Sequence, residues 1–234
     1  MKSTQQGFTL VEIAIVLVII GLLLGGVLKG QELINSAKAK SLVNDFRTIS
    51  TAIYAYQDRF RFMPGDDPAA GQHVGGDVAS SPDTEARGNG RIGGSWNSTT
   101  TTDESFLVWQ HLRRANLLTG TTSTSDTANY FPRNADNGRI GITGAAPITP
   151  ATGSATSNPS ASLPMTGAFF ICSDGISARL ARQVDSTMDD GATNTGNVRA
   201  MGQTDGASTA TGTAVDITPA LEAEGRLYTV CVAF

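Results

Sequence analysis

QQGFTLVEIAIVLVIIGLLLGGVL, residues Gln5–Leu28, is the most apolar stretch of the chain. Its 21 residues from Phe8 to Leu28 include a single charged side chain, that of Glu12. A helix of about 20 apolar residues spans the hydrocarbon core of a bilayer, so this stretch is long enough to cross a membrane. A carboxylate at the centre of such a span costs about 3 kcal/mol, and intramembrane acids usually have a function. Glu12 therefore requires an explanation.

Two ordinary interpretations of this segment leave Glu12 unexplained. A secretory signal peptide has an apolar region of about 7–15 residues, followed by small residues at its cleavage site. Here the apolar run is longer, Glu12 interrupts it, and no A-x-A pattern follows. A plain membrane anchor accounts for the length of the run but gives the carboxylate no role.

The string GFTLVE, residues 7–12, lies between a short polar leader and the apolar run. This arrangement resembles the type IV prepilin family, which includes type IV pilins and the pseudopilins of type II secretion. The resemblance covers residues 1 to about 60 and is loose beyond them. It implies that residues 1–7 are a cytoplasmic leader and that a prepilin peptidase cuts between Gly7 and Phe8. The new amino group of Phe8 would then be methylated.

The same resemblance implies a role for Glu12 in assembly. Cleavage creates a cationic amine on Phe8, four residues before Glu12. In a filament, the amine of one subunit can lie beside Glu12 of its neighbour, which compensates both charges in an apolar core. One such pair would also set the axial register of the subunits, as a single buried polar residue does in a coiled coil.

Apolar residues continue at helical spacing beyond the span. No proline occurs before Pro64, so the span and this stripe are predicted to form one helix of about 52 residues, about 78 Å long. The predicted domains are the leader 1–7, the transmembrane or assembly half of the helix 8–28, its amphipathic half 29–61, and the head 62–234. From Leu42 the apolar residues recur every three or four positions: Leu42, Phe46, Ile49, Ile53, Tyr56 and Phe60.

The head is predicted to be α+β, with a helix-and-sheet layer structure like that of pilins. Residues 103–120 predict a second helix with an N-cap at Asp103, and residues 175–188 predict a third. Residues 166–174 and 227–234 have the composition of strands. A C-terminal antiparallel sheet or hairpin would lie over the long helix.

The two cysteines, Cys172 and Cys231, lie in these two strand-like runs. One cysteine pair in an exported chain suggests a disulfide, and the bond would place the last strand beside the first. Two buried free thiols are the alternative. A metal site is disfavoured because neither His73 nor His111 sits at ligand spacing from a cysteine.

Recognisable catalytic motifs are missing from the sequence. It has no P-loop, H-E-x-x-H or C-x-x-C pattern, and no basic cluster of the kind that binds nucleic acid. His111 is expected on a helix surface, and His73 in a glycine-rich loop without a partner. The main interpretation of the acids Asp185, Asp189 and Asp190 is a turn with solvated carboxylates and no cofactor. A calcium site is the alternative, without the alternating acids of an EF-hand.

These observations predict a structural subunit rather than an enzyme. The first hypothesis is a major or minor subunit of a type IV pilus, and the alternative is a pseudopilin of type II secretion. A membrane-anchored periplasmic enzyme would leave Glu12 and its motif unexplained. The cysteine pair favours the pilus, because it resembles the disulfide-closed end of many pilins.

The resemblance also implies partners and a location. The partners are copies of this chain and other pilins, a prepilin peptidase, and an inner-membrane platform protein with a cytoplasmic ATPase. Before assembly, the helix would cross the bacterial inner membrane with the head in the periplasm. After assembly, it would lie in a cell-surface or periplasmic filament.

Overall fold

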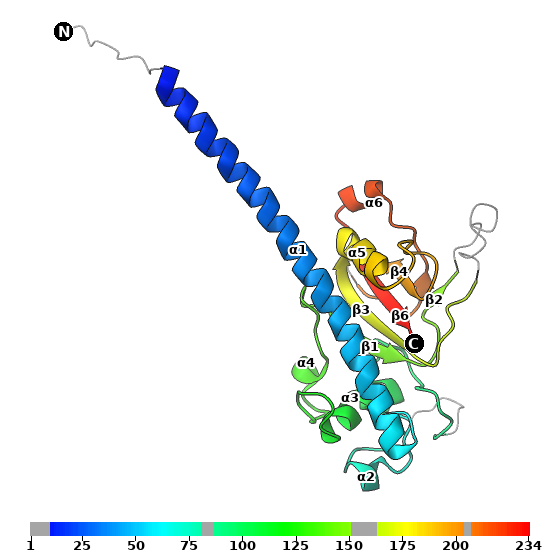
Figure 1. Cartoon of the computed structure of the whole chain (residues 1–234). Helices are drawn as coiled ribbons and strands as arrows, with labels where there is room; N and C mark the ends of the chain where they lie inside the picture. The colour runs from blue at the N-terminus through cyan, green and yellow to red at the C-terminus, as the bar shows by residue number, and fades with distance from the viewer. Residues whose placement is uncertain (1–9, 81–86, 151–162, 204–206) are drawn as a thin grey trace. The chain divides into compact units, whose positions relative to one another are not determined.

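The computed structural model describes residues 10–80, 87–150, 163–203 and 207–234. They form two compact units that divide after Ala37. Helix α1 (Leu10–Phe60) runs through both units without interruption, which confirms the single long helix (Figure 1). The cleavage-site residues Gly7 and Phe8 lie outside the described residues.

The first unit, described from Leu10 to Ala37, is helix alone. Large apolar side chains between Leu10 and Leu28 are 45–91 % exposed. In the described part of the chain, α1 is the one helix long and apolar enough to cross a membrane, and its most apolar stretch is not buried by the rest of the protein. A contiguous apolar surface of this kind marks contact with lipid or with another protein.

The second unit combines the rest of α1 with the head, which contains two sheets. Neighbouring strands of the four-stranded sheet, in the order β1-β3-β6-β4, are all antiparallel. A second sheet pairs β2 with β5 in parallel. This arrangement confirms the predicted α+β class. The elements after α1 are α2 (Ala70–His73), α3 (Glu104–Arg114), α4 (Thr127–Tyr130), β1 (Ile140–Thr143), β2 (Ile148–Thr149), β3 (Phe170–Ser177), α5 (Ala178–Met188), β4 (Val198–Gly202), β5 (Gly212–Thr213), α6 (Pro219–Ala223) and β6 (Leu227–Ala233).

Two predicted helices are shorter in the structure. The helix predicted over 103–120 ends at Arg114, because Asn116 adopts a left-handed φ of 59° that a helix cannot continue through. The backbone amides of Leu117 and Leu118 both fold back onto the carbonyl of Leu112. The helix predicted over 175–188 begins only at Ala178, because the three residues before it continue strand β3.

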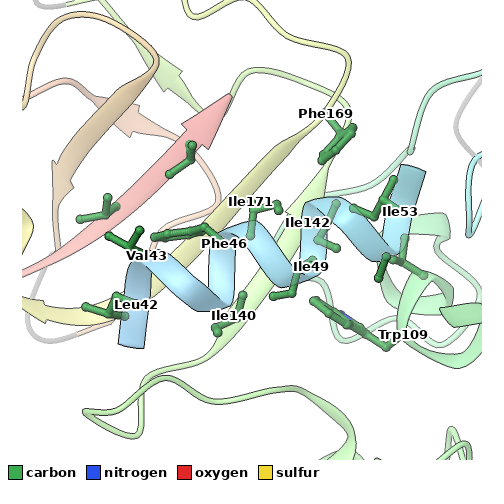
Figure 2. Packing of buried hydrophobic residues seen from close by; sticks show 14 of the residues in the cluster. Leu42, Val43, Phe46, Ile49, Ile53, Trp109, Ile140, Ile142, Phe169 and Ile171 are labelled. Atoms are coloured by element: carbon green, nitrogen blue, oxygen red, sulfur yellow. The ribbon is translucent and has the colours of Figure 1, made fainter. Parts of the chain in front are cut away.

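The core lies between the C-terminal half of α1 and one face of the sheet. Phe46 and Ile49 of α1 point toward Ile171 of β3 (Figure 2). The predicted stripe is buried from Leu42 to Tyr56, and only its last member, Phe60, is partly exposed. Close packing of this face fixes the head on α1.

The opposite face of the sheet has its own small core. Side chains alternate along β3, so Ile171 faces α1 while Phe170 and Cys172 face away from it. The outward cluster consists of Trp96, Ile148, Met165, Phe170, Cys172, Met201, Ala214 and Cys231. The sheet is therefore covered on both sides.

Candidate functional site

The candidate assembly surface is the exposed apolar face of α1 with one acid near its start. Glu12 lies in the first turn of α1, where the positive end of the helix dipole favours a carboxylate. The next charged residue along the chain is Lys29, whose ammonium group pairs with Glu32 at 2.7 Å. The apolar surface thus begins beside one carboxylate and ends at an exposed ion pair. This is the arrangement of a segment that can enter lipid or a helical bundle.

A buried hydrogen-bond network fastens the C-terminal end of α1 to the loop that follows it. The carboxylate of Asp67 is fully buried and accepts hydrogen bonds from the Tyr56 hydroxyl at 2.8 Å and the Ala69 amide at 2.9 Å. Nδ1 of His73 lies 2.7 Å from the same carboxylate. Burial alone would raise the pKa of Asp67, but the bonds from His73, Tyr56 and Ala69 outweigh it and lower the pKa. The expectation that His73 has no partner is therefore wrong.

His111 connects α3 to the same region and is fully buried, not at the surface as expected. Its Nδ1 accepts a 2.9 Å hydrogen bond from the backbone amide of Gly65, so Nδ1 carries no proton. Its Nε2 must then hold the proton and donate it to the Asp77 carbonyl at 2.7 Å. Burial lowers the pKa of His111, which keeps the ring neutral. His111 thus connects two loops through its two ring nitrogens.

Asp66, next to Asp67, organises a second loop. Its carboxylate accepts hydrogen bonds from the backbone amides of Gly88, Asn89 and Gly90. Burial raises the pKa of Asp66 more than these bonds lower it. The two adjacent acids therefore serve the packing of the head around the end of α1.

The disulfide between Cys172 and Cys231 is present and confirms the prediction. The two cysteines are direct partners in the register of β3 with β6, and both are fully buried. The bond joins positions 59 residues apart and encloses α5, β4, β5 and α6. It fixes the C-terminal part of the head to the middle of the sheet.

The acids predicted to be solvated are brought together at the end of α5. One carboxylate oxygen each from Asp185, Asp189 and Asp190 lies within 4.8 Å of the others. Asp190 is exposed and Asp189 partly so, but Asp185 is fully buried. The expectation of a solvated carboxylate is therefore wrong for Asp185.

Sequence reasoning missed the network around Asp67. Acids are normally exposed, so nothing in the string GDDP, residues 65–68, marks one of them as buried. In the sequence, Tyr56 is recognisable only as a member of the apolar stripe. Its phenol is the single local indication of a buried polar partner, because a buried tyrosine usually has a hydrogen-bond partner.

Comparison with known proteins identifies the N-terminal segment. Residues 2–28 match the family model of the prokaryotic N-terminal methylation motif. Neither a curated protein nor a solved structure matches the chain. The motif is the signature of pilins and pseudopilins, and it leads here into a long apolar helix and an antiparallel sheet. The chain therefore carries, at the start of a long apolar helix, the signature of the type IV pilin-like (prepilin) proteins, which include type IV pilins and type II secretion pseudopilins.

Proposed function

We propose that this protein is a structural subunit, major or minor, of a type IV pilus or a pilus-like filament. The observation that carries the proposal is the methylation motif at residues 2–28, continuous with a helix whose apolar side chains are exposed. Such a helix has two environments, lipid before assembly and a bundle of its own copies afterwards. The motif indicates a structural subunit rather than an enzyme.

In this proposal a prepilin peptidase cuts between Gly7 and Phe8 and leaves the leader in the cytoplasm. The amine of Phe8 is methylated and keeps its positive charge. Glu12 of a neighbouring subunit then lies beside that amine. An unpaired charge in a bundle of apolar helices is costly, so only the register that pairs the two groups is stable.

The helix holds the subunit in the bacterial inner membrane, with the head in the periplasm, until assembly begins. A platform protein and a cytoplasmic ATPase supply the work of extraction from the bilayer. The rigid attachment of the head to α1 suits this task, since the core between residues 42 and 56 and the buried Asp67 network transmit force between them.

A pseudopilin of a type II secretion system is the alternative function, because the same helix would serve it equally. The Cys172–Cys231 disulfide supports the pilus, since it closes the C-terminal part of the head as in many pilins. Deletion of the gene separates the two. Loss of surface filaments supports the pilus, whereas loss of secreted proteins from the medium supports the pseudopilin.

Mass spectrometry of the subunit recovered from cells tests the common part of the scheme. The expected N-terminus is a methylated Phe8, and the expected location in electron micrographs is sheared filaments that react with an antibody to the head. A mature chain that still begins at Met1 would contradict the proposal.

A further inference from the structure

The end of α5 brings three carboxylates together, those of Asp185, Asp189 and Asp190. Both oxygens of Asp185 are buried, and in the described part of the chain neither has a hydrogen-bond partner at normal geometry. Only the backbone amide of Gly191 lies close enough to lower the pKa of this carboxylate. A buried carboxylate is normally paired with a cation or hydrogen-bonded, because an isolated one is costly to desolvate. Asp185 instead faces oxygens of Asp189 and Asp190 within 4.8 Å. The buried carboxylate therefore has two further carboxylates, and no cation, as its nearest charged groups within the cluster.

The two other carboxylates are held in place by the loop that follows α5. Asp189 accepts hydrogen bonds from the backbone amides of Asn197 and Val198, both through Oδ2. Asp190 accepts from the Ala192 amide at 2.9 Å and from the Thr195 hydroxyl. The loop therefore holds these two acids near Asp185, although Asp190 is exposed and Asp189 partly exposed.

The position of the cluster on α5 favours a positive charge. Asp189 is the C-cap of α5, so the cluster lies at the negative end of the helix dipole. Burial raises the pKa of Asp185 to about 7, and the charges of Asp190 and Asp189 raise it in the same direction. The amide of Gly191 acts weakly against them. In the absence of a cation, the three acids thus resist being charged together.

The nearest basic side chain does not neutralise the cluster. The guanidinium of Arg199 donates to the carbonyl oxygens of Gly196 at 3.1 Å and Leu163 at 2.7 Å. Within the described residues it forms no ion pair with any of the three acids. It is close enough for the charges of Asp189 and Asp190 to affect its pKa, although burial lowers that pKa overall. This arginine therefore offsets the negative charge of Asp189 and Asp190 only in part.

We propose that Asp185, Asp189 and Asp190 form a calcium site that ties the end of α5 to the start of β4. Carboxylate oxygens are the ligands of hard divalent cations, and Ca²⁺ binds them at about 2.3–2.6 Å. Two ligands on one Ca²⁺ ion can therefore be up to about 5 Å apart, whereas the limit on Mg²⁺ is about 4.2 Å. The separation of the three oxygens, within 4.8 Å, lies inside the range that two ligands of one Ca²⁺ ion can span.

The experiment uses the full chain purified in detergent and stripped of metal with a chelator. Calcium chloride is titrated in by calorimetry, and heat unfolding is followed at about 1 mM calcium, the weak end of extracellular sites. Binding should raise the unfolding temperature, because a ligand of the folded state stabilises it by mass action. Magnesium chloride should produce a smaller rise.

Three variants identify the site. Asp185→Asn should abolish the heat of binding and unfold at a higher temperature than metal-free wild type, since it removes the repulsion. Asp190 is exposed, so the Asp190→Asn variant should keep the fold even if Asp185→Asn does not. This variant should weaken calcium binding by about tenfold or more. Asp216→Asn, an exposed acid of the head outside the cluster, should bind calcium like wild type.

Two outcomes would overturn the proposal. If calcium produces neither a heat of binding nor a shift in the unfolding temperature of wild type, Asp185 is a protonated buried acid and not a calcium ligand. If all three variants respond like wild type, calcium binds elsewhere on the chain. Neither outcome bears on the proposed filament function, which does not depend on the cluster.

Discussion

The hydroxyl of Tyr56, at the end of the buried stripe of α1, donates a 2.8 Å hydrogen bond to the fully buried carboxylate of Asp67. This bond joins the long helix to the loop that reverses the chain direction after it. In the described residues every buried apolar side chain lies at Ala39 or beyond, so a fragment of residues 38–234 contains the whole core. We call it the head fragment and use it for the stability measurements below.

Tyr56→Phe is expected to destabilise the head fragment by about 1.5–3 kcal/mol, the range for a hydrogen bond to a charged group. The reason is that a buried carboxylate loses a donor while the packing of the ring is kept. Urea unfolding of the fragment measures the change. Tyr54→Phe is the matched control, because Tyr54 is 47 % exposed and should change stability little. Equal losses in both variants would show that the bond to Asp67 contributes nothing.

The contribution of His111 to the stability of the head fragment should fall as the pH drops through about 6.5, the ordinary pKa of histidine, whereas the raised pKa of Asp185 acts in the opposite direction. Burial lowers the pKa of His111 in the folded state, so below that pH the unfolded chain takes up a proton that the folded chain refuses. The unfolded state then binds more protons, and the unfolding free energy decreases by up to about 1.4 kcal/mol per pH unit. The loss continues until the lower, folded-state pKa is reached.

Unfolding free energies measured at several pH values from 8 to 5 test this dependence. His111→Gln removes this titrating group, so the stability of wild type relative to the variant should decrease as the pH drops, whatever the variant's absolute stability. The slope is the informative quantity, because the substitution itself weakens the bonds to Gly65 and Asp77. A variant with the wild-type slope would assign the pH dependence to other groups.

The long helix and the disulfide were predictable because their signals are strong. Apolar residues recur at helical spacing over many turns, which predicts a helix. The chain has one cysteine pair, and each cysteine lies in a strand-like run, which leaves few other pairings of the strands. Strands β1 and β4 gave no such signal. All four residues of β1 are buried, as are the first four of β4, so neither shows the apolar–polar alternation of a half-exposed strand.

The errors at individual residues share a physical origin. His111 precedes two arginines, which suggests a solvent-exposed helix face, yet α3 is buried from Glu104 to Arg113. Asp67 and Asp185 are buried acids, and burial of an acid is decided by partners distant in sequence. Local pattern carries no information about those partners.

Loss of the disulfide should destabilise the head fragment by about 2–5 kcal/mol. The paired substitutions Cys172→Ala and Cys231→Ala test this by urea unfolding. Because both sulfurs are fully buried, the native bond should also resist a mild reductant unless denaturant is present. Thiol alkylation followed by mass spectrometry measures that resistance. Rapid reduction of the folded protein would contradict the buried position.

Gly65 and Gly90 form a matched pair that separates backbone strain from steric overlap. Both have left-handed φ angles, 90° and 84°. A Cβ on Gly65 would lie 2.4 Å from the Glu104 carbonyl oxygen, whereas one on Gly90 would meet nothing within 4 Å. Gly90→Ala should cost about 1–2 kcal/mol for the conformation alone. Gly65→Ala should cost clearly more, and equal losses in urea unfolding would show that the loop moves aside.

The last prediction follows from the proposed filament and concerns Glu12. Glu12→Ala and Glu12→Gln should insert in the membrane and be cleaved normally, because neither disturbs the apolar span or the Gly7–Phe8 bond. Both should fail to enter filaments, since the methylated amine of the neighbouring subunit loses the carboxylate that compensates it. Glu32→Ala is the control, an acid of the same helix in an exposed ion pair beyond the span, and it should assemble. The measurements are subunit mass by mass spectrometry and filament yield after shearing. Normal yield from Glu12→Gln would show that hydrogen bonding is sufficient, and normal yield from Glu12→Ala would remove the register role altogether.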